Sequence, residues 1–238
     1  MFRRLLLSAT ALVAVAGATL AADLPYQEAP SGYAPIFTWT GLYLGGQIGY
    51  AWGTDSFSGH SGGFAFSGPS FVPNGVVGGA HIGYNYQINQ FVVGLEGDID
   101  GSGVSRSYGW GPVVYGTQIP VDGSIRGRVG FALDRAMFYV AGGAAFASVT
   151  NSYTSFFGYN SFAKSLAGWT IGGGLEYAIT NNWSIRAEYR YSDYGSFTDF
   201  PLLAVPNGAV SHHETENAIR AGFSYKFDSL FAPSTAKY

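Results

Sequence analysis

The 238-residue chain contains no cysteine, which excludes disulfides, thiolate metal sites and cysteine nucleophiles. It also has little charge, because Asp, Glu, Lys and Arg make up only 11% of the residues. Soluble domains carry roughly 25%. After the N-terminus, no apolar run approaches the roughly 20 residues that a membrane helix requires. A membrane protein built without such helices must be a closed β-barrel, which satisfies every backbone group within its ring.

Basic residues are scarce as well: 12 Lys and Arg stand against 15 Asp and Glu, for a net charge of −3. This balance offers no basic face to a nucleic acid. Two of the basic residues, Arg3 and Arg4, precede an apolar core over 5–20 and a group of small residues. This order is typical of a cleaved signal peptide, so we expect residues 1–22 to be removed on export.

What the chain does contain is aromatic residues (17%), 35 glycines and alternating strands. Apolar and polar residues alternate with period two in eight segments, which predicts eight strands. The segments are 39–53, 75–88, 90–101, 121–134, 136–149, 166–179, 183–194 and 215–227.

The connections between these segments alternate in length. Tight turns are predicted at 88–90, 134–135 and 180–182, and long loops at 54–74, 102–120, 150–165 and 195–214. Outer-membrane barrels have an even strand number, short periplasmic turns and longer external loops. The pattern predicts an all-β fold, an eight-stranded antiparallel transmembrane β-barrel over 39–227. A periplasmic Pro-containing linker over 23–38 would precede it, and a periplasmic tail over 228–238 would follow. A soluble ligand-binding barrel has no reason to sort its loops in this way.

One face of each predicted strand is apolar and free of charge, as a lipid-facing surface requires. Aromatic residues near the strand ends fit the two interfacial girdles. They are Trp39, Trp52, Phe91, Trp183, Tyr191 and Phe227. Glycines recur within the strands, where glycine usually marks a bend or a close approach.

The opposite faces of the strands carry six acids and six bases. They are Glu96, Asp98, Asp100, Arg126, Arg128, Glu176, Arg186, Glu188, Arg190, Glu216, Arg220 and Lys226. An eight-stranded barrel is just wide enough for side chains to fill it, and buried charges must be paired. We therefore predict cross-strand ion pairs, with 96–100 set against Arg126 and Arg128, and Glu176 and Glu188 set among Arg186 and Arg190. The interior is then closed at rest, and a narrow conduit is the alternative.

Few residues offer other chemistry. His212 and His213, with Glu214 and Glu216, have the residue types of a metal site, but neighbouring histidines on a polar loop are usually only solvated. His60 lies beside serines in the first loop, with no second motif to support catalysis. We therefore predict no catalytic, metal or cofactor site. The aromatic loops either contact lipopolysaccharide, another barrel or a host surface, or fold over the barrel mouth, which we slightly favour; no loop partner can be named.

Several segments resemble one known family. They are 39–46 (WTGLYLGG), 94–98 (GLEGD), 123–130 (GSIRGRVG), 168–195 and 219–227. The chain resembles the alphaproteobacterial outer-membrane proteins of the Omp25/RopB type, which are grouped as porin-family or outer-membrane immunogenic proteins. The resemblance implies an outer-membrane barrel surrounded by lipid and lipopolysaccharide, without a catalytic site or cofactor, and linked to envelope integrity.

The family comparison also bears on the last strand. In many outer-membrane proteins the chain ends in an aromatic residue that the barrel assembly machinery reads. Phe223, Tyr225 and Phe227 have the right spacing for this signal, but 11 residues follow them. We therefore expect the last strand to be recognised internally.

Overall fold

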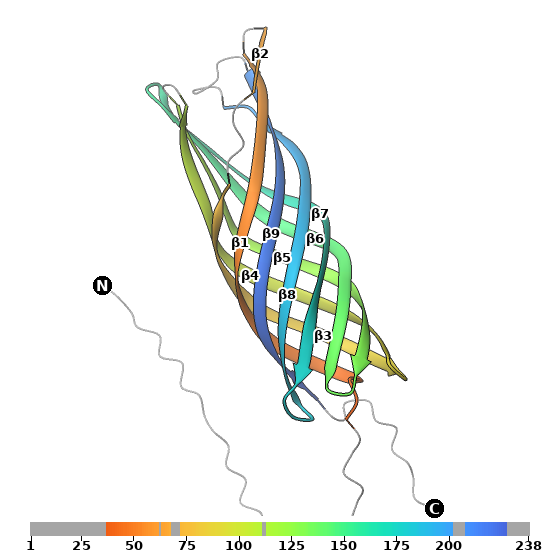
Figure 1. Cartoon of the computed structure of the whole chain (residues 1–238). Helices are drawn as coiled ribbons and strands as arrows, with labels where there is room; N and C mark the ends of the chain where they lie inside the picture. Colours follow the sequence, from red (N-terminus) through yellow and green to blue (C-terminus); the bar gives the residue numbers. More distant parts are fainter. Residues whose placement is uncertain (1–36, 62, 68–71, 111–112, 202–207, 228–238) are drawn as a thin grey trace, which may run out of the picture. The chain divides into compact units, whose positions relative to one another are not determined.

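The computed structural model describes residues 37–61, 63–67, 72–110, 113–201 and 208–227. Eight antiparallel strands form a ring that closes where the first strand pairs with the last (Figure 1). The ring consists of β1 (Gly41–Ser61), β3 (Asn74–Ile88), β4 (Phe91–Trp110), β5 (Val113–Leu133), β6 (Ala136–Ser155), β7 (Gly158–Ala178), β8 (Trp183–Asp199) and β9 (Gly208–Lys226). A short strand, β2 (Phe64–Ser67), pairs only with the end of β1. The predicted eight-stranded barrel is thus confirmed, while the predicted signal peptide and C-terminal tail lie outside the described residues.

Three tight turns join strands at one end of the barrel, which we call the short-turn end. They lie where the sequence predicts them, between β3 and β4, β5 and β6, and β7 and β8. Asn89 and Asp134 have positive φ, 54° and 53°, and these residue types tolerate the left-handed conformation that a two-residue hairpin turn requires. No helix in the described part of the chain is long and apolar enough to cross a membrane.

The opposite end, which we call the hairpin end, differs from the prediction. Most of the residues assigned to long loops are strand: β4 and β5 continue to either side of 111–112, and β6 and β7 meet at Phe156–Phe157. Three register shifts, between Gly101 and Val104, Gln118 and Val121, and Asp193 and Ser196, mark the start of these extensions. Neither face of the extensions is consistently apolar, so the hydrophobic pattern did not reveal them.

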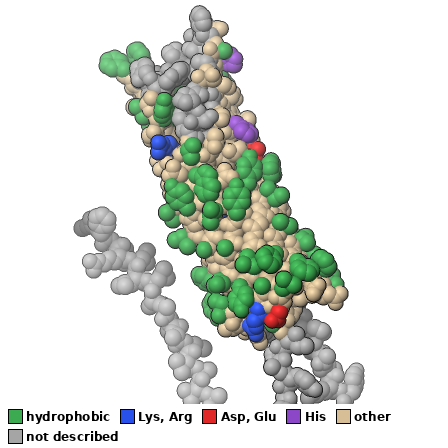
Figure 2. Space-filling view, in the orientation of Figure 1, with side chains coloured by type: hydrophobic (Ala, Val, Ile, Leu, Met, Phe, Trp, Pro, Cys, Tyr) green, Lys and Arg blue, Asp and Glu red, His purple; other side chains and the backbone are tan. Residues whose placement is uncertain are grey.

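The predicted apolar faces are exposed on the outside of the barrel, where they form a band (Figure 2). Leu95 and Ile48 are exposed by 68% and 63%, whereas lysines and arginines are few on the face shown. Trp39 is a correction: predicted for the girdle, it is only 3% exposed and packs inside the short-turn end. Phe37 and Thr38, predicted as linker, accompany it.

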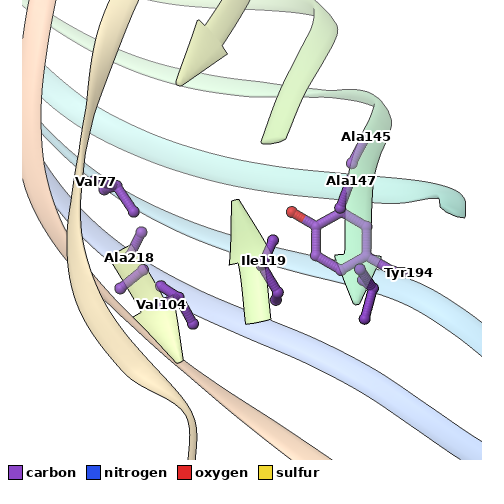
Figure 3. Packing of buried hydrophobic residues seen from close by; sticks show 9 residues of the cluster. Val77, Val104, Ile119, Ala145, Ala147, Tyr194 and Ala218 are labelled. Carbon is purple, nitrogen blue, oxygen red and sulfur yellow. The ribbon is translucent and has the colours of Figure 1, made fainter. Parts of the chain in front are cut away.

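The interior consists of layers and is not polar throughout. Next to the short-turn end lies an apolar floor of Trp39, Val92, Ala132, Met137, Tyr139, Ala141 and Ala178. Charged residues form the middle. Beyond most of them is a belt of small apolar residues together with Tyr194 (Figure 3): Ala51, Val77, Val104, Ile119, Ala145, Ala147, Val149, Tyr194 and Ala218. On β9, the buried Glu214 and Glu216 lie on the hairpin side of Ala218. The sequence analysis assigned only charged and polar packing to the lumen, so both apolar layers are findings of the structure.

Candidate functional site in the barrel interior

Eleven of the twelve charged residues predicted for the interior are buried there. They are Glu96, Asp98, Asp100, Arg126, Arg128, Glu176, Arg186, Glu188, Arg190, Glu216 and Arg220. The twelfth, Lys226, is a correction, because it lies at the short-turn end and donates a hydrogen bond from Nζ to the Thr38 carbonyl oxygen. β9 ends at Lys226, so this side chain reaches the rim of the barrel and does not enter the lumen.

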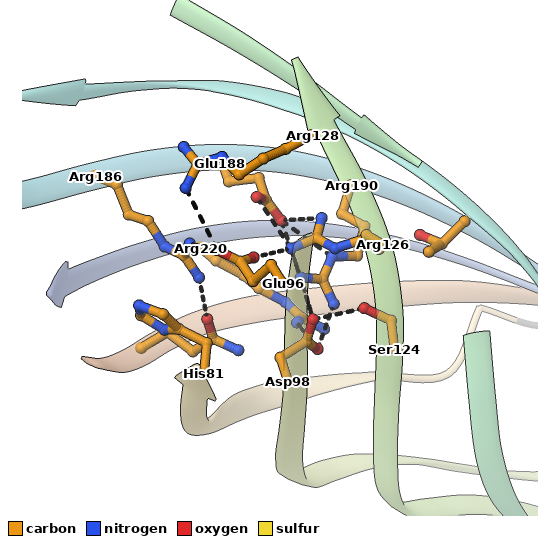
Figure 4. A network of polar contacts seen from close by, with 12 residues as sticks. His81, Glu96, Asp98, Ser124, Arg126, Arg128, Arg186, Glu188, Arg190 and Arg220 are labelled. Carbon is orange, nitrogen blue, oxygen red and sulfur yellow. Dashed lines mark hydrogen bonds and ion pairs between the residues drawn. The ribbon is translucent and has the colours of Figure 1, made fainter. Parts of the chain in front are cut away.

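Eight of these residues form a connected network that we call the ionic lattice: Glu96, Asp98, Arg126, Arg128, Glu176, Arg186, Glu188 and Arg190. Figure 4 labels all of them except Glu176. Arg126 is fully buried and lies at its centre. Its Nη2 atom is 2.6 Å from Glu96 Oε1, and its Nη1 atom is 2.9 Å from Glu188 Oε1. Four carboxylates therefore balance four guanidinium groups in a region from which water is largely excluded.

Many of the lattice contacts cross the lumen and do not join neighbouring strands. Arg186 on β8 lies 2.5 Å from Glu96 on β4, and Arg190 on β8 lies 2.8 Å from Asp98 on β4. Glu176 lies directly opposite Arg186 in the β7–β8 register, as expected, but its ion pair is with Arg128 on β5, at 2.8 Å. The sequence predicted the members of the lattice, but their partners depend on the closure of the ring, which strand periodicity does not determine.

Neutral side chains complete the lattice, and the sequence analysis did not select them. The Tyr43 hydroxyl donates to Glu96 (2.9 Å) and accepts from Arg128 (3.0 Å). The Tyr139 hydroxyl donates to Glu188 (2.9 Å). Both tyrosines lie on the inward-facing parity of their strands, and this position is the signal that could have identified them.

Each interior arginine has a glycine directly opposite it on a neighbouring strand. The pairs are Gly143 with Arg126, Gly94 with Arg128, Gly222 with Arg186, Gly172 with Arg190 and Gly49 with Arg220. A Cβ atom on Gly49 would lie 2.9 Å from Arg220 Cγ, and one on Gly94 would lie 3.2 Å from Arg128 Cγ, whereas one on Gly143 would lie 2.1 Å from the Ile125 carbonyl oxygen of the neighbouring strand. The glycines therefore leave the space that long arginine side chains need in a narrow barrel.

Toward the hairpin end, acids outnumber bases in a region that we call the acidic layer: Asp100, Asp122, Glu214, Glu216 and Arg220. Arg220 binds Asp100 through Nη1 and lies 3.0 Å from Asp122 through Nη2. The Glu216 Oε2 atom has no hydrogen-bond partner among the described residues. With every group ionised, the layer carries a charge of −3. The sequence analysis did not select Asp122, although this residue shares the inward-facing parity of Arg126 and Arg128 in the predicted strand 121–134.

The histidines of the predicted fourth loop lie on β9 and face opposite ways. His212 is buried between the rings of Tyr115 and Phe197, with centroid distances of 5.3 Å to each. His213 contacts Ser196 on the outside. Successive strand residues alternate faces, so the two cannot share one ion. No group of three or more His, Asp or Glu in the described residues could hold a metal ion.

The aromatic residues of the hairpin end divide into two groups. Tyr115 and Tyr153 turn inward beside His212, as in the capping interpretation. In contrast, Phe156 and Phe157 at the β6–β7 tip are 92% and 78% exposed. The favoured arrangement, in which the aromatic residues fold over the barrel mouth, therefore holds for Tyr115 and Tyr153 but not for Phe156 and Phe157.

Comparison with known proteins gives a consistent assignment. The family model described as "Outer membrane protein beta-barrel domain" matches residues 8–227. The chain belongs to this family. It is 35% identical to the 31 kDa outer-membrane immunogenic protein of Brucella melitensis, over 89% of this chain and 95% of that one. It is also 33% identical to the 22 kDa outer membrane protein of Rhizobium leguminosarum bv. viciae, over 84% and 83% of the two chains.

Among solved structures, the barrel is similar to the outer membrane protein OprG from Pseudomonas aeruginosa. The TM-score is 0.52 at 13% identity, with 80% of this chain and 97% of that chain covered, and this likeness concerns the fold alone. As a member of the outer-membrane β-barrel family, the protein resides in the outer membrane. Its exposed apolar band faces lipid, and the general rule for such barrels predicts that its short-turn end faces the periplasm.

Proposed function

We propose that this outer-membrane β-barrel has a structural role in envelope integrity and presents its long hairpins as a surface, without catalysing a reaction. The observation that carries the proposal is the filled interior. The ionic lattice occupies the lumen between two apolar layers. Side chains that pair across the lumen hold opposite walls together and leave little room for a solute.

Lipid and lipopolysaccharide are the proposed surroundings of the apolar band and the exposed aromatic tip. The proposed partner during biogenesis is the barrel assembly machinery, which would read Phe223, Tyr225 and Phe227 on the outer face of the last strand. This idea predicts that Phe227→Ala lowers the amount of assembled barrel in the outer membrane. Assembly equal to wild type would reject Phe227 as part of the signal.

Single-channel recording of the refolded barrel in planar bilayers tests the structural role. A quiet membrane, or only rare small openings, supports a closed barrel. Reproducible discrete steps would overturn closure and favour a narrow, low-conductance pore for small solutes. Heat-dependent migration on gels, recorded for the same preparation, shows that the barrel is folded.

The narrow pore is the second candidate because the acidic layer holds three more acids than bases. Such a layer attracts small cations to the mouth of a conduit. If steps occur, this candidate predicts a preference for cations that Glu216→Gln reduces. Asp193→Asn is the matched control, since it removes the same charge from the outside of β8.

A further inference from the structure

The short stretch of chain that precedes β1 crosses the short-turn end of the barrel. We call residues 37–40 the strap. Trp39 is its centre, with its side chain buried in the apolar floor of the lumen. The Phe37 ring packs edge-on against the Trp39 ring, with their centroids 5.0 Å apart. The strap thus places two aromatic rings at the mouth of the barrel.

Polar contacts fasten the strap at three places around the mouth. At the end of β3, the Trp39 backbone N–H donates to Gln87 Oε1 (2.8 Å) and the Gln87 N–H donates to Thr40 Oγ1 (2.9 Å). In the β5–β6 turn, the Asp134 carbonyl oxygen accepts from the Trp39 indole (3.2 Å). At the end of β9, Lys226 donates to the Thr38 carbonyl oxygen.

Cations hold the outer ring of the strap in place. The Arg135 guanidinium lies 5.4 Å from the centre of the Phe37 ring, and the Lys226 ammonium lies 5.0 Å from it. Both distances are within the range of cation–π attraction. The β5–β6 turn and the end of β9 therefore each contact the strap through one hydrogen bond and one cation–π contact.

Behind the strap lies a cavity of about 20 Å³, close to the space that one water molecule occupies. Its lining includes Trp39, Tyr43, Asn85, Glu176, Ser184 and Ser224. Glu176 belongs to the ionic lattice, and Ser224 is hydrogen-bonded to His81 (2.9 Å). The strap, together with Asn181 and Asn182 of the β7–β8 turn, therefore separates the first polar groups of the lumen from the solvent at this end.

We propose that the strap is a closure of the lumen at its periplasmic end, with Trp39 as the plug. Two observations favour a separable closure over a further piece of wall. Residues 37–40 lie outside the strands of the ring, and their contacts are side-chain contacts and single hydrogen bonds. The strap can therefore leave the mouth while the strand ladders remain intact. The proposal does not depend on the structural role proposed above.

The absence of cysteine allows a direct test. Ser224→Cys places a single thiol behind the strap, and its reaction with a trimethylammonium methanethiosulfonate reagent is followed in isolated outer membranes. We expect slow labelling of this variant, and labelling at least about tenfold faster when Trp39→Ala is added. Equal rates in the two proteins would overturn the proposal.

Two controls separate closure from general loosening of the barrel. Phe91→Ala removes an aromatic side chain that is exposed on the outside at the same end and does not line the cavity, and we expect it to leave the labelling of the Ser224→Cys thiol slow. Ser192→Cys places a thiol deeper in the lumen, where Ser192 is hydrogen-bonded to Thr170. Acceleration of both thiols by Trp39→Ala would mean a loosened barrel and would overturn the proposal.

A second variant covers the case in which Trp39→Ala does not assemble. Gln87→Ala keeps the plug but removes the acceptor of the Trp39 N–H. We expect the Ser224→Cys thiol to be labelled faster in this variant than in the protein whose strap is unchanged. Equal labelling rates in the two proteins would count against the strap as a closure held by these contacts.

Discussion

The ionic lattice and the acidic layer are built from the same residue types and share the strands β4 and β5, yet they differ in charge balance. In the lattice, four carboxylates meet four guanidinium groups, and Arg126 contacts both Glu96 and Glu188. The acidic layer contains four acids and one arginine, which forms ion pairs with Asp100 and Asp122, and Glu216 Oε2 lacks a hydrogen-bond partner among the described residues. Burial is nearly complete in both regions, so the number of partners makes the difference.

This comparison teaches that a buried charge in a narrow barrel stabilises only as part of a complete set. A matched carboxylate holds two walls together, because removing it leaves its partners charged and buried. An unmatched carboxylate loses its hydration on burial and gains no ion pair that would offset the lost free energy. The two regions should therefore respond in opposite ways to the loss of one acid.

The largest effect is expected in the lattice. Glu188→Ala leaves Arg126 and Arg190 with an uncompensated charge and removes the acceptor of the Tyr139 hydroxyl. We expect the free energy of unfolding to fall by about 3–5 kcal/mol, measured by denaturant unfolding of the refolded barrel in lipid vesicles. An unchanged unfolding midpoint would show that the lattice does not hold the walls.

A smaller loss is expected from crowding the lattice. Gly143→Ala puts a methyl group into the backbone beside Arg126, and overpacking of this kind costs about 1–3 kcal/mol. Gly127→Ala is the matched control, since its Cβ would meet nothing closer than 4.0 Å. Equal unfolding midpoints for the two variants would contradict the idea that Gly143 lets the backbones of β5 and β6 approach closely beside Arg126.

In the acidic layer, the loss of one acid should raise the free energy of unfolding. Glu216→Gln keeps the side-chain shape and removes one charge from a region with excess acid, so we expect a gain in stability of up to about 1 kcal/mol. The same unfolding assay measures it, with Asp193→Asn as an outside control. A clear loss of stability would mean that Glu216 has a buried positive partner, and the comparison between the two regions would fail.

The smallest effect is expected outside both regions. Phe156 and Phe157 are almost fully exposed at the β6–β7 tip, so replacing both with serine should change the unfolding free energy by no more than about 0.5 kcal/mol. A substantial loss would show that the tip packs against another part of the barrel.

The sequence predicted whatever depends on local periodicity. Alternation along each strand was enough for the ring of eight strands, the lipid-facing band and the inward row of charges. Asn89 and Asp134 lie in turns that the sequence predicted, because the short connections interrupt the alternation. These features follow from two-residue periodicity and turn chemistry, which are properties of neighbouring residues.

What the sequence did not reveal depends on closure of the ring. Arg186 meets Glu96 because β8 and β4 face one another across the lumen, and no local spacing encodes that distance. Trp39 resembled a girdle residue because it is an aromatic residue at the end of the predicted strand 39–53, but β1 begins at Gly41 and Trp39 turns inward. The strand extensions were missed because neither of their faces is consistently apolar.

The pairing of β1 with β9 also has a consequence for biosynthesis. The first and last strands of the chain are neighbours along Tyr43–Ser61 and Gly208–Lys226. A nascent chain that has not yet received β9 therefore exposes two unpaired sheet edges, which are templates for aggregation. The β1–β9 pairing can form only after translation has passed Lys226. A closed ring is therefore possible only for a chain in which all eight ring strands have been synthesised.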